Sequence, residues 1–384
     1  MKRITSIDFV RGLVMIIMAL DHTREMMHFP SKPLDLATTT PALFFTRWIT
    51  HLCAPTFVFL SGTSAYLSFS RQQDLRSSRR WLFSRGVWLI LLEFTVITFA
   101  IWTDIHFRTL FFQVIATIGF GFIFLALLLK VNSRILGSIG LLLIFGHDLI
   151  TLLPLPANPV LKYAISFLFI PRIVQPTPSF IFLYWYPVLP WFGIMLAGFA
   201  CGSLFSLEGP LRKKICLRLG LACLTLFVLL RWINVYGDPS PWTVQKNNVF
   251  TFLSFINTTK TPPSLLFTLM TLGIMFLLLG LAEGKNNPVT RIISIYGKVP
   301  LFYYLVHLYV IHAAMFIMVF AQGLRPTHLD FGPLKSGRPE AGSGLSLPYV
   351  YLVWLIIVVG LYPLCRWYSR YKAGHQDNKW LRYI

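Results

Sequence analysis

The chain has 384 residues, of which 55% are hydrophobic and only 12% are charged, and its mean hydropathy is +0.66. A soluble globular protein carries about twice that share of charged residues, so the composition excludes one. Apolar runs of about 20 residues recur along the chain, which excludes a β-barrel, whose strands are shorter and alternate in polarity. The net charge is +20. The basic residues cluster in short loops between apolar runs, where they set orientation and meet anionic membrane lipid, so no nucleic-acid partner is expected.

The first predicted span, residues 7–28, is apolar enough to cross a bilayer and still carries ionisable groups. At 3.6 residues per turn, one stripe of this helix holds Asp8, Arg11, Met15, Met18, His22 and Glu25. Charged groups at membrane depth are costly, so they face a protein interior or a water-filled cavity and usually mark a functional site. The alternative is a buried set of salt bridges and hydrogen bonds that holds the bundle together.

Further apolar runs bring the total to about ten membrane spans. They lie at residues 7–28, 51–70, 81–103, 109–130, 135–153, 184–207, 215–236, 262–283, 292–321 and 347–367. The sequence therefore predicts an all-α, polytopic transmembrane helical bundle that forms one domain over residues 1–384. With the N- and C-termini cytoplasmic, Lys and Arg inside outnumber those outside by roughly two to one, as the positive-inside rule requires. We expect a multi-pass protein of the cell membrane, namely a bacterial inner membrane.

Three long loops fall on the expected outer side. Residues 154–183 are rich in proline and resemble a re-entrant or interfacial segment, because proline repeatedly removes helix donors. Residues 237–261 and 322–346 are the other two, and the Gly- and Pro-rich composition of the last predicts a mobile flap. Long loops on one side suggest that a bulky substrate arrives there; the alternative is that they only cap helices.

His22 and His51 are the first candidates for chemistry, because both fall at a similar depth toward the outer half of the bilayer. Histidine accepts protons near neutral pH, and a neighbouring carboxylate fixes its tautomer, so a His–carboxylate pair is a general-base candidate. Asp21 is the nearest carboxylate. Adjacent residues point about 100° apart on a helix, so Asp21 can serve either histidine. The sequence leaves that choice open.

The ninth span adds His307, one turn after Tyr303, and either side chain could line the same cavity. The alternative is a histidine that packs against a tyrosine with no further role. The histidines show no metal-binding spacing, and there is no Walker loop or nucleophile elbow. No metal is predicted.

Several strings resemble known families. Arg11, followed after ten residues by His22, resembles the first-helix signature of the acyltransferase-3 membrane family. Other strings, SIDFVRG (6–12), DH (21–22), RWITHLCAPTFVFLSG (47–62), YPVLPWFG (186–193), NVYGDP (234–239), TPPSL (261–265) and KVPLFYY (298–304), extend over nearly the whole chain. Through them the chain more closely resembles bacterial membrane proteins related to heparan-alpha-glucosaminide N-acetyltransferase.

The resemblance implies transfer of an acetyl group from cytoplasmic acetyl-CoA to an acceptor on the far side of the membrane. In the heparan enzyme the active histidine follows the first helix, where His28 is a loose positional counterpart. His22 matches the acyltransferase-3 signature instead, and His51 stands about where the heparan enzyme has an aspartate. The resemblance leaves open which histidine acts.

Such a reaction needs a base for the acceptor and donors for the oxyanion. His22 or His51 fits the first role, and Arg11 and the tyrosines fit the second. CoA is polyanionic, so its phosphates suit the basic cytoplasmic residues Arg76, Arg79, Arg80 and Arg85, with the pantetheine arm threading along the stripe that contains Asp8 and Arg11.

The leading interpretation is therefore a membrane-embedded acyltransferase that acts on a glycan, glycolipid or other sugar-bearing acceptor. A second is a small-solute or proton-coupled transporter or flippase that uses the same intramembrane charges. A third is a non-enzymatic partner that anchors an envelope assembly. The sequence also leaves open that the chain assembles as a homodimer.

Overall fold

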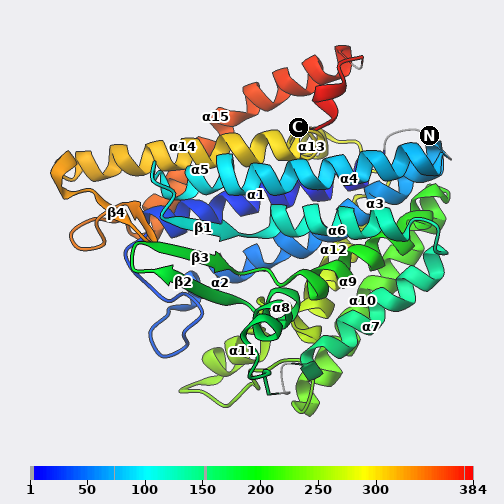
Figure 1. Ribbon diagram of the computed structural model, residues 1–384, viewed down its shortest axis with the longest axis horizontal. Helices are drawn as coiled ribbons and strands as arrows, with labels where there is room; N and C mark the ends of the chain where they lie inside the picture. The colour runs from blue at the N-terminus through cyan, green and yellow to red at the C-terminus, as the bar shows by residue number, and fades with distance from the viewer. Residues whose placement is uncertain (1–3, 73, 151–153, 376, 384) are drawn as a thin grey trace.

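The computed structural model describes residues 4–72, 74–150, 154–375 and 377–383 (Figure 1). Its main body is a bundle of long helices, several of which run roughly along the longest axis of the molecule in Figure 1. These helices are α1 (Thr5–Met27), α3 (Cys53–Gln72), α4 (Leu75–Leu92), α6 (Val114–Leu128), α7 (Ser133–Ile150), α9 (Val188–Ala200), α10 (Gly209–Ile233), α12 (Leu265–Ala282), α14 (Pro300–Ala321) and α15 (Leu347–Gly374).

Each predicted span overlaps one of these helices. Eight helical segments of the described chain are long and apolar enough to cross a membrane. The two others are α1, which carries five Asp, Glu or Arg residues, and α6, which is 15 residues long. The all-α polytopic bundle predicted from the sequence is confirmed.

The prediction of a continuous span over residues 292–321 is wrong, because the structure divides it into α13 (Pro288–Lys298) and α14. Val299 between them has the non-helical torsions φ −133° and ψ 50°. Pro300 causes the break, since proline lacks the N–H that would continue the helix and disfavours helical torsions at the residue before it. The short helix α13 is therefore free to pack across α1.

The long connections and most of the remaining short elements gather at one end of the bundle, which we call the loop face. Residues 109–112, predicted within the fourth span, instead form strand β1 (Thr109–Phe112). It pairs in parallel with β3 (Phe180–Tyr184), which pairs antiparallel with β2 (Arg172–Thr177). The segment 322–346 contains a second small sheet, of β4 (Asp330–Gly332) and β5 (Lys335–Gly337).

Short helices and 3-10 turns connect the long helices at the two ends of the bundle. The helices are α2 (Pro41–Trp48), α5 (Thr98–Trp102), α8 (Pro159–Phe169) and α11 (Asn248–Ile256), and the 3-10 turns are Ile49–Leu52, Cys201–Ser206, Pro326–His328 and Lys379–Arg382. A π-helical turn, Glu93–Ile97, joins α4 to α5. The opposite end, where α1 begins and α15 ends, carries most of the basic residues; we call it the basic face.

Glycines let two pairs of helices touch through their backbones. A Cβ on Gly12 of α1 would collide with the carbonyl oxygen of Ile293 in α13, and a Cβ on Gly297 would collide with that of Asp8. Gly62 of α3 and Gly198 of α9 are equally close to the facing backbone. Small residues at such crossings allow close packing inside a membrane. The contacts of Gly12 and Gly297 fix the position of α1 against α13.

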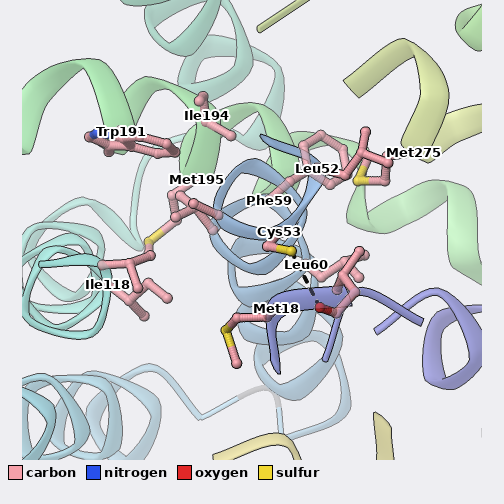
Figure 2. Close-up of a cluster of buried hydrophobic side chains, with 14 of the residues drawn as sticks. Met18, Leu52, Cys53, Phe59, Leu60, Ile118, Trp191, Ile194, Met195 and Met275 are labelled. Atoms are coloured by element: carbon pink, nitrogen blue, oxygen red, sulfur yellow. Dashed lines mark hydrogen bonds between the residues drawn. The ribbon is translucent and has the colours of Figure 1, made fainter. Parts of the chain in front are cut away.

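The apolar core lies between α1, α3, α6, α9 and α12, and Figure 2 shows part of it. Side chains from several helices interdigitate there, among them Met18, Leu60, Ile118 and Met195. Cys53 donates a hydrogen bond from Sγ to the carbonyl oxygen of Val14 at 3.3 Å. The middle of α1 is thus embedded in a dense core, and its C-terminal end, with Asp21 and His22, extends toward the loop face.

Candidate functional site

Two of the predicted histidines meet near the loop face. His22 lies in the last third of α1 and His307 in the first half of α14. Nδ1 of His22 is 2.8 Å from Nε2 of His307, and the rings stack with centroids 5.0 Å apart and planes 14° apart. The ring of Tyr303 also stacks on that of His307, with centroids 5.1 Å apart.

The hydrogen bonds of the pair assign the tautomer of each ring. Nδ1 of His307 is 2.9 Å from the carbonyl oxygen of Tyr303, which only accepts, so this nitrogen carries the proton. In neutral His307 the lone pair then lies on Nε2. His22 must donate to it from Nδ1. The lone pair of His22 therefore lies on Nε2, the arrangement that a general base requires.

His22 lines a cavity of about 940 Å³ at the loop face, which we call the loop-face cavity. His22 is half-buried, whereas His307 is fully buried, so His22 is the member of the pair that a substrate can reach. Much of the wall comes from the segment 322–346, so the segment predicted to be a flap lines the same cavity as His22. Aromatic and charged side chains complete the wall, among them Glu25, Arg47, Trp102, Trp185, Tyr186, Lys260 and Arg338.

Asp21 is held by two arginines. Its Oδ1 accepts from Nη2 of Arg24 at 3.0 Å, and its Oδ2 accepts from Nη1 of Arg47 at 2.5 Å. Within the described chain Asp21 forms no hydrogen bond or ion pair with His22 or His51. The structure therefore gives His22 another histidine as its hydrogen-bond partner, and it uses Asp21 to tie α1 to α2.

His51 lies away from this cavity. Its side chain is 1% exposed, and its ring packs edge-on against Phe267 with centroids 5.3 Å apart. Neither ring nitrogen has a hydrogen-bond partner among the described residues. The structure does not bring His51 to the His22–His307 pair, and its role as a base stays a prediction.

Two further cavities lead from the basic face toward His22. The mouth cavity, about 430 Å³, is lined by Asp8, Arg11, Ser64, Arg71 and neighbouring side chains. The inner cavity, about 220 Å³, shares Arg11 and Ser64 with it. Nη2 of Arg11 donates to Oγ of Ser64 at 3.0 Å, so one hydrogen bond marks the junction of the two cavities.

Tyr304 lies between the inner cavity and the histidines. It lines the inner cavity, and its ring meets that of His22 edge-on, with centroids 6.3 Å apart. Among the described residues its hydroxyl makes no hydrogen bond. The inner and loop-face cavities have no lining residue in common, and the Tyr304–His22 contact joins one wall of each.

The arginines predicted to bind the donor are dispersed. Arg85 lines the inner cavity, and its guanidinium lies 5.9 Å from the ring centroid of Tyr383. Arg79 donates to the carbonyl oxygens of Ala126 and Leu127 at the end of α6, and Arg80 is exposed. Of the predicted set, only Asp8, Arg11 and Arg85 line these cavities.

Sequence reasoning assigned no role to Arg47, Lys260 or Arg338, and it did not single out Tyr304. Arg47 precedes the second span at the depth of Asp21, and that charge pairing was a usable signal. Lys260 and Arg338 come from loops, and no pattern in the sequence shows which loop folds over the end of α1.

Comparison with known families places the chain. A family profile described as heparan-alpha-glucosaminide N-acetyltransferase, catalytic, matches residues 3–232, which is more than half of the chain. The match includes Arg11, His22 and His51. No curated protein matches. A multi-pass membrane bundle that matches this profile is a membrane acetyltransferase in general terms. The chain therefore belongs to the heparan-alpha-glucosaminide N-acetyltransferase catalytic-domain family.

Proposed function

We propose that the protein moves an acetyl group from cytoplasmic acetyl-CoA to a sugar-bearing acceptor on the other side of a bacterial inner membrane, with His22 as the general base. The family relationship supports acetyl transfer. The observation that carries the proposal is the position of His22. It lines the loop-face cavity, its free lone pair is on Nε2, and its ring contacts Tyr304 of the inner cavity.

The donor approaches from the basic face, which the positive-inside rule makes cytoplasmic. Arg11 and Arg71 of the mouth cavity and Arg85 of the inner cavity supply positive charge for the CoA phosphates. The inner cavity is otherwise mainly apolar, with Phe57 and Trp81 among its walls, which suits the acyl end of the pantetheine arm.

The acceptor binds in the loop-face cavity. Trp102, Trp185 and Tyr186 offer flat apolar faces for sugar rings, and the charged groups around them offer partners for hydroxyl groups. This combination, with its volume of about 940 Å³, favours a sugar-bearing acceptor over a purely apolar one.

The proposed acetyl transfer uses two side chains, His22 as the base and Tyr304 as a hydrogen-bond donor. Nε2 of His22 removes the proton from the acceptor O–H or N–H as that atom attacks the thioester carbonyl carbon, forming a C–O or C–N bond. The hydroxyl of Tyr304 donates a hydrogen bond to the resulting oxyanion. Collapse of the oxyanion breaks the C–S bond, and the departing thiolate takes the proton from the His22 imidazolium. The products are CoA and the acetylated acceptor.

The test measures acetyl-CoA turnover by the purified protein in nanodiscs, beside His22→Ala and His51→Ala. General-base catalysis contributes about 100-fold or more, so His22→Ala should lose turnover by that factor and still be stabilised by CoA in a thermal melt. Turnover that survives in His22→Ala and disappears in His51→Ala would assign the base to His51. A folded wild type that neither binds CoA nor consumes the thioester would refute acyl transfer and favour a transporter.

A further inference from the structure

A fourth cavity, at the basic face, plays no part in the proposed reaction. It has a volume of about 550 Å³ and lies between the start of α1, α13 and α15. Its wall contains four cationic side chains, Lys285, Arg291, Lys298 and Arg366. The described part of the wall carries no carboxylate. We call this cavity the basic pocket.

No carboxylate of the described residues neutralises the charges in the basic pocket. None of the four cations forms an ion pair or a hydrogen bond with a carboxylate within the described ranges. The carboxylate nearest in sequence, Glu283, accepts from Arg212 at 2.5 and 2.9 Å and from Ser6 at 2.8 Å. Asp8 of α1 lines the mouth cavity instead. Like charges gathered around one cavity repel each other, and a bound anion removes that repulsion.

The rest of the pocket suits a group that is polar at one end and apolar at the other. Hydroxyl and amide groups come from Thr5, Asn286 and Ser294, and apolar surface comes from Phe9 and Tyr362. The adjoining outer surface of α13 and α15 is apolar as well. Ile292, which also lines the pocket, is 47% exposed, and Trp367 is 57% exposed. Basic pockets between membrane helices at the cytoplasmic surface typically hold phospholipid head groups.

The basic pocket and the mouth cavity lie on different sides of α1. Thr5 and Phe9 face the basic pocket, while Ile4, Ile7 and Arg11 face the mouth cavity, and the two share no lining residue. A ligand in the basic pocket is therefore outside the route of the donor. Since Arg291 and Lys298 belong to α13, such a ligand also touches the helix that packs backbone to backbone on α1.

We propose that the basic pocket binds the phosphate group of an anionic phospholipid, with Arg291 and Arg366 as its main cationic contacts and the acyl chains along α13 and α15. Arginine can donate two parallel hydrogen bonds to the oxygen atoms of a phosphate, which lysine cannot do. Substitution of these two arginines is therefore the most direct test of the pocket.

The experiment measures lipid binding by the full-length protein in detergent. Phosphatidylglycerol or phosphatidylcholine is titrated while native mass spectra and thermal melts are recorded. The wild type should bind and be stabilised by phosphatidylglycerol and not by phosphatidylcholine. Arg291→Gln/Arg366→Gln should bind phosphatidylglycerol at least about ten-fold more weakly, while Lys213→Gln/Lys214→Gln, which removes two basic residues of α10 outside the pocket, should bind as the wild type does.

Other outcomes overturn the proposal. An equal loss in the two double variants would mean that diffuse surface charge binds the lipid. If CoA or inorganic phosphate stabilises the wild type and loses that effect in Arg291→Gln/Arg366→Gln, while phosphatidylglycerol binding is unchanged, the pocket serves a soluble phosphate ligand. Failure of the proposed acetyl transfer appears separately, as absent turnover in a protein that still binds phosphatidylglycerol. Should the double variant not fold, the single variants Arg291→Lys and Arg366→Lys give the same comparison.

Discussion

His22 and His307 share a hydrogen bond that decides which nitrogen of His22 carries a lone pair. We expect His307→Leu, which removes the acceptor, to lower turnover about 10-fold to 100-fold, as removal of the hydrogen-bond partner that orients a metal-bound histidine does. His307→Gln keeps an acceptor oxygen on a side chain of similar reach, so it should retain more activity. CoA-dependent thermal stabilisation serves as the control for folding. Equal loss in both variants would contradict a role in orienting His22.

The sequence predicted the separate members of this site better than their contacts. His22 and His307 were identifiable because histidine is rare and costly at membrane depth. Their contact was not, since 285 residues separate them and nothing local fixes how α14 packs on α1. The sequence predicted that Asp21 serves a histidine, but in the structure its carboxylate pairs with Arg24, one turn away, and with Arg47 of α2. The approach of Arg47 depends on the packing of α2 against α1, which no local pattern shows.

Glu283, just after α12, gives a prediction for pH. Partial burial opposes ionisation of Glu283, but hydrogen bonds from Arg212 and Ser6 outweigh it and hold the pKa of this carboxyl below its usual range. A lowered pKa in the folded state stabilises the protein above the unfolded value of about 4.3, and the benefit disappears as pH falls through the folded value.

We therefore expect Glu283→Gln to melt at a lower temperature than the wild type at pH 7, with a difference that shrinks as the pH falls below about 4. Thermal melts across this range measure it. Glu208→Gln is the matched control, because Glu208 is exposed and its side chain does not cap α10. A difference for Glu283→Gln that stays constant down to acidic pH would disprove the proposed ionic contribution.

At the scale of elements, the crossing of α1 and α13 is the contact that fixes the first helix. Gly12→Ala places a methyl group against the carbonyl oxygen of Ile293, so we expect a loss of roughly 1–3 kcal/mol or more in stability. Gly360→Ala on α15 meets no heavy atom within 4 Å and should be neutral or slightly stabilising. Denaturant or thermal unfolding of both variants tests this. A tolerated Gly12→Ala would show that the two helices can separate without cost.

The helices were the most predictable elements, because a run of about 20 apolar residues has few alternatives in a membrane. The division at Val299 was also readable from Pro300, but the continuous apolar run on both sides concealed it. Strand β1 was harder to foresee. Its partner β3 lies about 70 residues further along the chain, and only the folded bundle brings the two edges together.

At the scale of the whole molecule, the alternation of ten helical segments puts both ends of the described chain at the basic face (Figure 1). We expect this face to be cytoplasmic. Green fluorescent protein fused after Ile384 should fluoresce, because it folds in the cytoplasm. Alkaline phosphatase fused after Gly344, in the segment that covers the loop-face cavity, should be active. An active phosphatase at the C-terminus would reverse the orientation and with it the proposed side of the donor.

The separate linings of the inner and loop-face cavities also have a bioenergetic consequence. A water-filled passage open at both ends would let protons cross the membrane and would dissipate the membrane potential. The inner and loop-face cavities share no lining residue, so in the proposed reaction only the acyl group passes from one to the other and the CoA nucleotide stays at the basic face. The proposed transfer would therefore modify material outside the cytoplasm without exporting CoA and without opening a path for protons.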